Sequence, residues 1–478
     1  MKTLLVSVPT KQLTSFHRDN PSIPLGLAYL AAMLEKEKLE VSVVDMCENS
    51  IEDIKGIIKE HNPDIVGISC FTQTRKVVFR MASLIKKINK KITIVLGGSH
   101  ATFLYEQILK NYKEIDIVVL YEGEFTFPEL IKTLADKGDL NKVKGIAFRK
   151  GKKIVKTEER ETIHDLDILP FPAYHLFDLN RYVTVSHDNI PGSGLDGKRN
   201  SELKCVDIIT TRGCPNRCTY CSTTVFWKNK YRAMSPKRVA DLIEHLYKKY
   251  EIKVFSFDDD TFTVLQGRVI EICKEIIKRK IKIRWSCGTR VNFVSEELLK
   301  WMKKAGCYHI FFGVESGSST ILRNINKLCT KKQILDSIKL CKKIGINAGM
   351  QIMVGNSGEN NKTIKETMDL IKETDPPSLG TSIVTIFPGT ELYELSKRQG
   401  FINDAYWLSD GYAPIYTYEN SLQKLRKYEH EILLYHYLKK RDYLRYVSSF
   451  LLQYPFTRHI VYQAVEIRKY FKLRKSRN

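Results

Sequence analysis

Short apolar runs alternate with amphipathic stretches over residues 1–140. The runs have the length of strands, and the stretches between them have the apolar spacing of helices with one buried face. We expect strands at Leu4–Val8, Val41–Asp45, Asp64–Ser69, Ile92–Leu96 and Ile115–Leu120. We expect helices at Leu25–Lys38, Ile51–Glu60, Lys76–Ile88, Tyr105–Asn111 and Pro128–Leu134. The alternation predicts a Rossmann-like α/β domain, whose parallel sheet is covered on both faces and binds ligands at the carboxyl ends of its strands.

Residues 141–204 have a different pattern, which we interpret as a hairpin followed by a linker. Residues 144–157 predict the hairpin, with Lys150–Lys153 at its turn. Two prolines in Leu166–Pro172 fix an extended path, as in a segment that crosses between domains. Residues 187–204 are rich in glycine, serine, aspartate and asparagine, and they predict a flexible loop.

The strand–helix alternation resumes over residues 205–398. The expected strands are Val206–Thr210, Val254–Phe257, Ile283–Cys287, His309–Val314, Asn347–Val354 and Ser382–Phe387. Amphipathic segments such as Val239–Tyr250 and Lys331–Ile344 separate them. Six such units predict a partial (β/α)6 barrel, whose chemistry lies at the carboxyl ends of the strands.

Residues 399–478 form a basic, aromatic region that we expect to be helical. From Ser421 to Asn478 there are 14 lysines and arginines against four acids. The apolar-aromatic run Tyr446–Val465 contains Pro455, Arg458 and His459, so it is too interrupted to span a bilayer. The region could form a helical cap that closes the barrel, or it could lie on an anionic membrane surface.

Composition places the chain among soluble globular proteins. Its 478 residues are 43% hydrophobic and 27% charged, which allows two or three domains. The net charge of +23 is spread over lysine-bearing helix faces, so no nucleic-acid partner is expected. No uninterrupted apolar stretch of about 18 residues occurs, and Met1–Pro9 has the pattern of a first strand rather than of a secretory signal. We expect a cytoplasmic protein, because a reducing compartment suits its eleven cysteines.

Three of the cysteines form the most specific motif in the sequence. Cys214, Cys218 and Cys221 stand at CxxxCxxC spacing directly after a predicted strand. Thiolates are soft ligands, and three on one loop can hold three corners of an iron–sulfur cube, which leaves one iron open for a catalytic ligand. A zinc site usually needs four ligands, and no second cysteine pair is present. The other eight cysteines are scattered, and we interpret them as core or neutral residues.

The motif, with the aromatic Tyr220 before its last cysteine, resembles that of the radical S-adenosylmethionine (SAM) superfamily. The resemblance implies a [4Fe-4S] cluster held by the three cysteines, whose open iron binds SAM. Carried over to the strand ends of this sequence, it implies SAM contacts from Tyr220, Asp258, Asp259, Arg290, Glu315 and Ser316. The alternatives are an exposed acidic loop in which Asp260 caps a helix, and an Arg290 that pairs with an acid. Ser357 departs from the proline that is usual in relatives.

The first domain resembles the cobalamin-binding domain that precedes many radical SAM barrels. The matching pieces, in order, are Pro24–Leu30, Asp64–Ser69, Leu96–Thr102 and Tyr121–Glu124. The resemblance implies cobalamin contacts from Ser69, Gly97, Gly98, Glu122 and Gly123. The cobalt-ligating DxHxxG pattern of cobalamin mutases is missing; we interpret His17 as a surface loop residue and not as a cobalt ligand, and the role of His100 stays open.

Together the two resemblances imply a class B-like, cobalamin-dependent radical SAM enzyme that functionalises an unactivated carbon, with methyl transfer as the leading reaction. Ring closure and carbon–carbon coupling are the alternatives, and a non-enzymatic cobalamin- or SAM-binding protein is a further one. A methylthiotransferase is disfavoured, because the first domain has only Cys47 and Cys70. The expected partners are a small-molecule or lipid-like substrate, a one-electron reductant such as flavodoxin or ferredoxin, and a membrane surface as a peripheral contact of residues 399–478.

Overall fold

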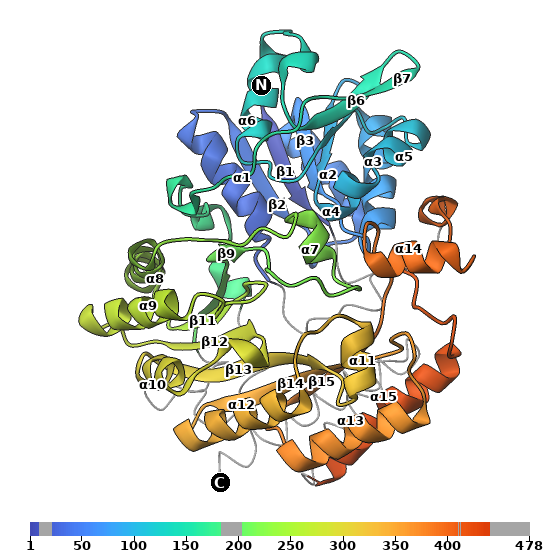
Figure 1. Ribbon diagram of the computed structural model, residues 1–478. Coiled ribbons are helices and arrows are strands. Elements are labelled where there is room, and N and C mark those ends of the chain that lie inside the picture. Colours follow the sequence, from blue (N-terminus) through green and yellow to red (C-terminus); the bar gives the residue numbers. More distant parts are fainter. Residues whose placement is uncertain (9–21, 183–202, 410, 412, 440–478) are drawn as a thin grey trace, which may run out of the picture.

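A computed structural model describes residues 1–8, 22–182, 203–409, 411 and 413–439. Two α/β units lie one above the other, with the N-terminal unit at the top of Figure 1. Three sequence features lie outside the described residues: His17, nearly all of the predicted flexible loop at 187–204, and the run Tyr446–Val465.

The N-terminal unit is built on a seven-stranded sheet in the order β2-β1-β3-β4-β5-β6-β7. Its strands are β1 (Thr3–Ser7), β2 (Val41–Asp45), β3 (Ile65–Ser69), β4 (Thr93–Gly97), β5 (Ile117–Val119), β6 (Ile146–Lys150) and β7 (Lys153–Lys156). The first five strands are parallel, as the alternating pattern predicts. They are almost wholly buried apart from β2.

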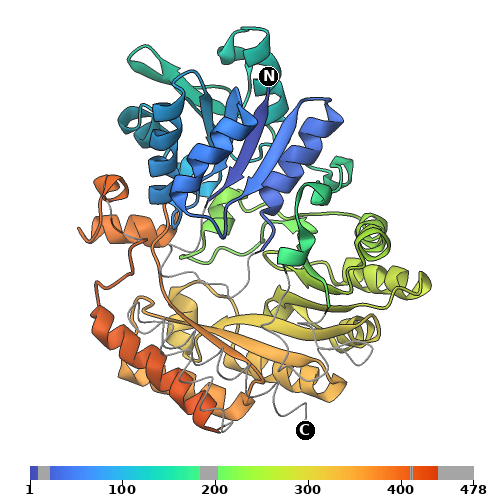
Figure 2. The ribbon, with the colours of Figure 1, turned by 180° about the vertical axis from the view of Figure 1, so that it is seen from behind.

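Helices cover both faces of this sheet (Figures 1 and 2). One face packs against α1 (Leu25–Lys36) and α6 (Thr126–Ala135), and the other against α2 (Ile54–His61), α3 (Arg75–Ile88) and α5 (Tyr105–Asn111). The two faces have separate apolar clusters because successive strand residues point to opposite sides. A short helix, α4 (Ser99–Phe103), follows β4.

The predicted hairpin is confirmed as β6 and β7, and it extends the N-terminal sheet instead of standing apart. β6 pairs antiparallel with β5, with Ile117 opposite Phe148. Phe148 is buried among the residues that α1 and α6 cover. The linker that follows is packed as well, since Leu166 and Tyr174 are buried together with barrel residues.

The second unit is an open, all-parallel sheet in the order β15-β14-β13-β12-β11-β8. Its strands are β8 (Cys205–Ile208), β11 (Val254–Phe257), β12 (Arg284–Thr289), β13 (Cys307–Glu315), β14 (Asn347–Val354) and β15 (Leu379–Ile383). Its helices are α8 (Pro236–Tyr250), α9 (Gln266–Lys278), α10 (Glu296–Lys304), α11 (Ser319–Asn324), α12 (Lys331–Ile344), α13 (Asn361–Thr374) and α14 (Glu391–Arg398). Six strands in this order form the expected partial barrel.

The sixth strand was predicted at Ser382–Phe387, and this placement is wrong: the strand ends at Ile383. The Val384 N–H still donates to the carbonyl of Val354 at the end of β14 (2.8 Å). The chain then turns to pair with the C-terminal region, where the Ile386 N–H donates to the carbonyl of Pro414 (2.8 Å). The apolar run therefore continues past the sheet, because its side chains fill a second cluster that includes Trp407.

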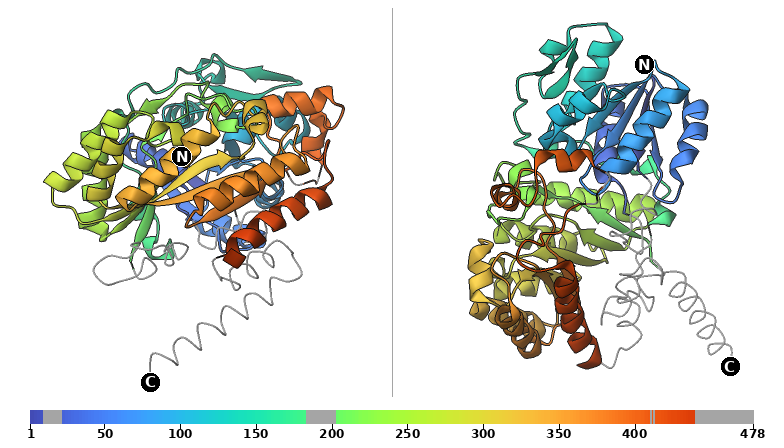
Figure 3. Two further views of the ribbon diagram at one scale, coloured as in Figure 1. Left: turned by 60° about the horizontal axis from the view of Figure 1, so that its bottom comes forward. Right: turned by 90° about the vertical axis from the view of Figure 1, so that its right-hand side faces the viewer.

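The last described helix, α15 (Leu422–Lys439), packs against β15 and α13 and lies along the barrel (Figures 2 and 3). Leu425 and Ile432 are fully buried in the barrel core. Up to residue 439, the C-terminal region thus packs as the helical-cap alternative requires. Within the described part of the chain, no helix combines the length and the apolar character needed to cross a membrane.

Candidate functional site

The three motif cysteines lie on one loop between β9 (Thr211–Arg212) and α7 (Ser222–Phe226); we call it the cluster loop. Gly213 opens the cluster loop with φ +88°, and a Cβ there would lie 2.0 Å from the carbonyl oxygen of Lys230. Only glycine fits this close approach. All three cysteines are partly exposed free thiols.

The loop after β11 and the end of α11 hold the cluster loop in place. The Gly213 N–H donates to the Asp260 carboxylate (2.9 Å), and Asn326 donates its side-chain N–H to the carbonyl of Arg217 (2.8 Å). Thr219 donates its N–H to Ile325 (3.2 Å). The sequence suggested Asp260 only as a helix cap, whereas here it orients the backbone beside the first cysteine.

The donor set fits an iron–sulfur cluster. Arg290 donates to the sulfur of Cys218 (Nη1 to Sγ, 3.3 Å), and Thr261 donates to that of Cys214 (3.3 Å). Hydrogen bonds to sulfur are a principal means by which proteins tune such clusters. Among the described residues, no three histidine, cysteine or acidic side chains gather around a point suited to a single ion. A cube does not require that, because each cysteine binds a different iron.

Two predicted SAM residues, the buried Arg290 and the partly buried Glu315, lie beside this loop. Arg290 is 5% exposed, and its Nη2 has no hydrogen-bond partner in the structure. Such a donor suits a ligand carboxylate, with which arginine pairs in a two-pronged manner. Glu315 has φ +69° and accepts from Lys327 (2.8 Å). Burial and, next, the neighbouring Glu315 carboxylate raise the pKa of Tyr220 well above its usual value.

The other predicted SAM residues differ in orientation. Asp258 is exposed at the end of β11. Asp259 points inward and accepts from the Thr210 N–H and hydroxyl (2.6 and 2.8 Å) and from the Thr211 N–H (2.5 Å). Burial raises the pKa of Asp259 to about 6. Ser316 is fully buried, and its hydroxyl hydrogen-bonds to that of Thr367 (3.1 Å). The Asp259 side chain thus supports the backbone that leads into the cluster loop, and the Ser316 side chain supports the turn after β13.

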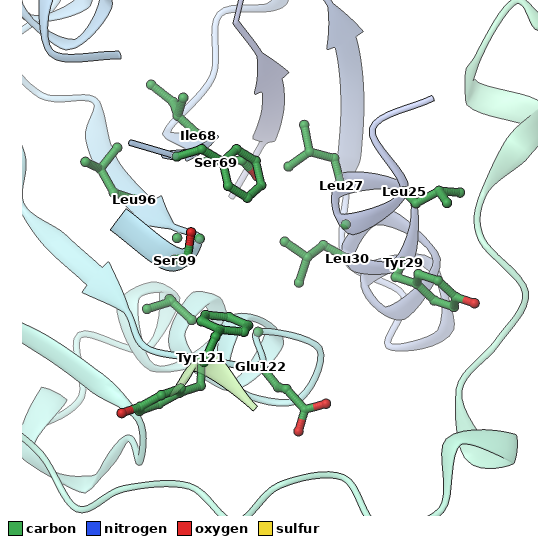
Figure 4. A pocket seen from close by; sticks show the side chains of 18 of the residues that line it. Leu25, Leu27, Tyr29, Leu30, Ile68, Ser69, Leu96, Ser99, Tyr121 and Glu122 are labelled. Atoms are coloured by element: carbon green, nitrogen blue, oxygen red, sulfur yellow. The ribbon is translucent and has the colours of Figure 1, made fainter. Parts of the chain in front are cut away.

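A cavity of about 520 Å³ lies between the two units (Figure 4). Its N-terminal wall includes all five residues predicted for cobalamin, which are Ser69, Gly97, Gly98, Glu122 and Gly123. Its other wall comes from the cluster-loop side and includes Arg212, Ser222, Phe226 and Trp227. Leu27 and Leu30 extend from α1 toward Ile68 and Leu96 across the cavity.

Glycine shapes the N-terminal wall. Gly98 has φ +93°, and a Cβ there would lie 2.8 Å from the carbonyl oxygen of Cys70. At Gly97 the space beyond the backbone is open, with nothing closer than 4.0 Å. The wall therefore offers bare backbone and apolar side chains at the strand ends, which fits a large, flat cofactor. The Glu122 carboxylate is turned away from the leucine-lined part of the cavity (Figure 4).

His100 does not line this cavity. It is 1% exposed, shares a hydrogen bond between its Nδ1 and the Thr72 hydroxyl (3.2 Å), and meets the ring of Trp407 edge-on. Burial lowers its pKa to about 3. His100 thus packs behind the wall, in line with the missing cobalt-ligand pattern.

Several residues of the site were missed at the sequence level. Arg212 and Trp227 line the cavity next to the cluster loop, and Lys327 holds Glu315. The position of Arg212, directly before the cysteine motif, was an available signal. No sequence signal separates Lys327 from the chain's many surface lysines, although in the structure it is 4% exposed.

Known proteins have the same two domains in the same order. The family model of the B12 binding domain matches residues 15–131, and that of the Radical SAM superfamily matches residues 208–371. An uncharacterized methyltransferase of Pyrococcus horikoshii is 33% identical over 433 residues, 90% of this chain and 89% of that protein. The anaerobic magnesium-protoporphyrin IX monomethyl ester cyclase of Rubrivivax gelatinosus is 32% identical, over 78% of this chain and 66% of that protein.

A solved structure has the same architecture. The radical SAM methyltransferase of Kitasatospora setae, determined with cobalamin and a [4Fe-4S] cluster bound, superposes with a TM-score of 0.68 at 18% identity. The match covers 90% of this chain and 82% of that one. The chain belongs to the radical SAM enzymes that carry a B12-binding domain, whose cofactors are a [4Fe-4S] cluster, SAM and cobalamin.

Proposed function

We propose that this enzyme transfers a methyl group from SAM to a carbon atom of a small-molecule substrate. The observation that carries the proposal is the cavity between the units, because one wall consists of the B12-domain strand ends and the other adjoins the cluster loop. The methyltransferase relative, aligned over 90% of this chain, supports this reaction.

The proposal assigns a task to each part of the site. Cys214, Cys218 and Cys221 hold the cluster, and Arg290 binds the SAM carboxylate through its unpartnered nitrogen while it hydrogen-bonds to Cys218. When bound, the cofactors supply the reductive cleavage of SAM and a carrier for its methyl group. The apolar wall keeps water from the reacting groups.

The residues of the B12-binding domain are proposed to bind cobalamin through their main chain. We propose that the backbone at Ser69, Gly97, Gly98 and Gly123 lies against cobalamin, and that Glu122 contributes its main chain there. On the barrel side, Glu315 and the neighbouring Tyr220 are proposed for the polar groups of SAM, and the exposed Asp258 for its amino group. Asp259 and Ser316 are proposed to act through the backbone that they hold.

A substrate-free experiment tests methyl transfer. The protein is reconstituted under anaerobic conditions with iron, sulfide and hydroxocobalamin, reduced, and given SAM. A methyltransferase of this design releases S-adenosylhomocysteine, about one equivalent per cobalamin, as the methyl group leaves SAM. It also releases 5′-deoxyadenosine, called deoxyadenosine below, from the slow reductive cleavage of SAM. If deoxyadenosine forms and S-adenosylhomocysteine does not, methyl transfer is wrong.

Cysteine variants test the assignment of the cluster. Replacing Cys214, Cys218 and Cys221 by alanine should remove the cluster iron and all deoxyadenosine. The matched control is Cys273→Ala, which removes a buried thiol from α9 and should keep both. Unchanged iron in the triple variant would refute the cluster assignment.

Ring formation is the second candidate, because the cyclase relative is 32% identical to this chain, against 33% for the methyltransferase, although its match covers less of both chains. The same incubation separates the two, since a cyclase consumes SAM without forming S-adenosylhomocysteine. For the one-electron reductant, we propose a flavodoxin or a ferredoxin. A lipid-like substrate and a membrane contact are proposed from the basic aromatic region at 399–478.

A further inference from the structure

Four buried, charged side chains join the two units beside the cavity; we call them the Arg–Glu network. Arg212 contacts Glu122 (Nη1 to Oε1, 2.5 Å) and Glu124, and Arg232 contacts Glu122 (Nη1 to Oε2, 2.7 Å). Each of these side chains is at most 9% exposed. The paired residues are 88 to 110 positions apart in the sequence, so every pair is a contact between the B12-binding domain and the barrel.

The Arg–Glu network lies between the two loops that carry the cofactor sites. Its two glutamates flank Gly123 in the loop after β5, at the wall proposed for cobalamin. Arg212 is the last residue of β9, two positions ahead of Cys214, and it pairs with Arg232 of the short strand β10. A shift of either loop must therefore move or break the network.

Additional contacts fix the orientation of both arginines. The main chain of Ile163, in the linker, donates its N–H to Glu122 (2.8 Å) and accepts from Arg232 (2.6 Å). Both guanidinium groups also lie over the ring of Trp227, at 5.7 and 5.2 Å from its centre. A planar guanidinium held by carboxylates and an aromatic face has little freedom to turn.

The physics of buried ion pairs assigns this network to geometry more than to stability. Two positive and two negative charges balance, but the cost of removing them from water largely cancels their attraction. The main effect of the network is therefore to fix the relative orientation of the residues that it joins. The reaction depends on such precision, because a displacement of about 1 Å between reacting groups can lower a rate about a hundredfold.

We propose that the Arg–Glu network is a positioning device that holds the cobalamin loop at a set distance and angle from the cluster loop. Its members are positioning residues, and Glu122 acts through the two arginines of the barrel. The inference rests on the proposed function only where the test measures S-adenosylhomocysteine formation. Loosening the network should slow S-adenosylhomocysteine formation, which needs both units. It should spare deoxyadenosine formation, which needs the barrel alone.

The test uses Arg232→Gln, since Arg232 does not line the cavity. In the reconstituted enzyme with SAM and reductant, S-adenosylhomocysteine formation requires SAM and cobalamin to meet, whereas deoxyadenosine formation requires only the cluster and SAM. We expect the variant to lower the first rate at least tenfold and to change the second less than about twofold. Arg232→Lys keeps the positive charge but loses the planar group whose Nη1 contacts both Glu122 oxygens and the Ile163 carbonyl, so it should give an intermediate loss.

Arg279→Gln is the matched control, because Arg279 pairs with three acids on barrel helices that are remote from the cavity. It should leave both rates unchanged. Hydrogen–deuterium exchange of the same proteins gives a readout independent of activity: exchange should rise at residues 119–126 and 211–214 in Arg232→Gln but not in Arg279→Gln. Equal loss of both rates, or unaltered exchange in both segments, would overturn the proposal. If the wild type forms no S-adenosylhomocysteine, the proposed function fails, and exchange still decides the network.

Discussion

At the residue scale, the environment of a side chain decides whether it faces a ligand or supports the backbone. Arg290 and Asp259 both lie at the ends of neighbouring barrel strands, and both are buried. Arg290 has a buried nitrogen without a hydrogen-bond partner, whereas the oxygens of Asp259 accept three hydrogen bonds from Thr210 and Thr211. Different consequences of mutation follow.

Arg290→Met should weaken SAM binding at least tenfold, because the methionine cannot pair with the SAM carboxylate. Equilibrium binding of SAM to the reconstituted protein measures this, together with the perturbation of the reduced cluster's electron paramagnetic resonance spectrum. Arg284→Met is the control, since Arg284 begins the same strand at its opposite end. Wild-type affinity in Arg290→Met would contradict the assignment.

Asp259→Asn should destabilise the fold by about 2 kcal/mol, because an amide nitrogen faces donors that a carboxylate oxygen accepted. We expect the variant to retain less iron, since Thr211 is three residues from Cys214. Urea unfolding and iron analysis measure the two effects. Asp258→Asn, at the exposed neighbour, should change the stability by less than about 0.5 kcal/mol.

The sequence identified the strand end that carries Asp258 and Asp259 but not the direction of either side chain. Adjacent residues at a strand end point to opposite sides, and which one turns inward depends on donors that a neighbouring segment brings. For Asp259 these donors come from Thr210 and Thr211, which lie 49 and 48 residues earlier in the chain. That pairing exists only in the folded sheet.

At the element scale, the sequence predicted the bounds of some strands but not of others. The strands Val254–Phe257 and Asn347–Val354 begin and end as predicted. The sixth strand shifted because its apolar run serves two clusters in succession, one in the sheet and one with Trp407. Periodicity records burial, and it does not record which partner buries the residue.

The loop after β14, where the family resemblance implied a proline at position 357, is secured by a distant residue. The Ser357 hydroxyl and the Gly358 N–H both donate to the carboxylate of Glu419 (2.6 Å each). Glu419 belongs to the C-terminal region, so a distant residue supplies the constraint that a proline would supply locally. Beside it, Glu359 is buried and accepts from the Gly355 N–H.

Glu359 should make stability depend on pH. Burial raises the pKa of Glu359 to about 7, from an ordinary value of 4.5. Between these values the folded state binds more protons than the unfolded state, so the free energy of unfolding falls as the pH rises from about 4.5 to 7. Glu359→Gln should remove this fall, which amounts to on the order of 2–3 kcal/mol.

Urea unfolding of the apoprotein at several pH values measures the effect as the difference between wild type and Glu359→Gln. Glu366→Gln, on α13, serves as the control and should run parallel to the wild type. A constant difference between wild type and Glu359→Gln over this pH range would show that Glu359 ionises normally.

At the scale of the whole molecule, buried arginines hold two of the contacts between the B12-binding domain and the rest of the chain. The Arg–Glu network joins the loops beside the cavity, and the C-terminal region returns to α3 of the first domain. Neither contact could be predicted from the sequence, because the residues that pair are far apart in the chain and meet only in the folded protein. The sequence did indicate both units, their order and the cysteine motif, since those depend on local patterns.

Arg75 secures the second contact, and Arg75→Met should loosen it. Its guanidinium lies 5.5 Å from the centre of the Trp407 ring and donates to the carbonyls of Thr72 (3.0 Å), Trp407 (3.4 Å) and Gly411. Because Arg75 is 1% exposed, its loss leaves buried carbonyls without donors and should cost about 3 kcal/mol. Thermal unfolding should then begin at a lower temperature, with limited proteolysis cutting first around residues 403–413. The control is Arg80→Met, on the exposed side of the same helix with one ion pair to Glu52, which should change little. Equal stability of the two variants would mean that the C-terminal region is held by its apolar contacts alone.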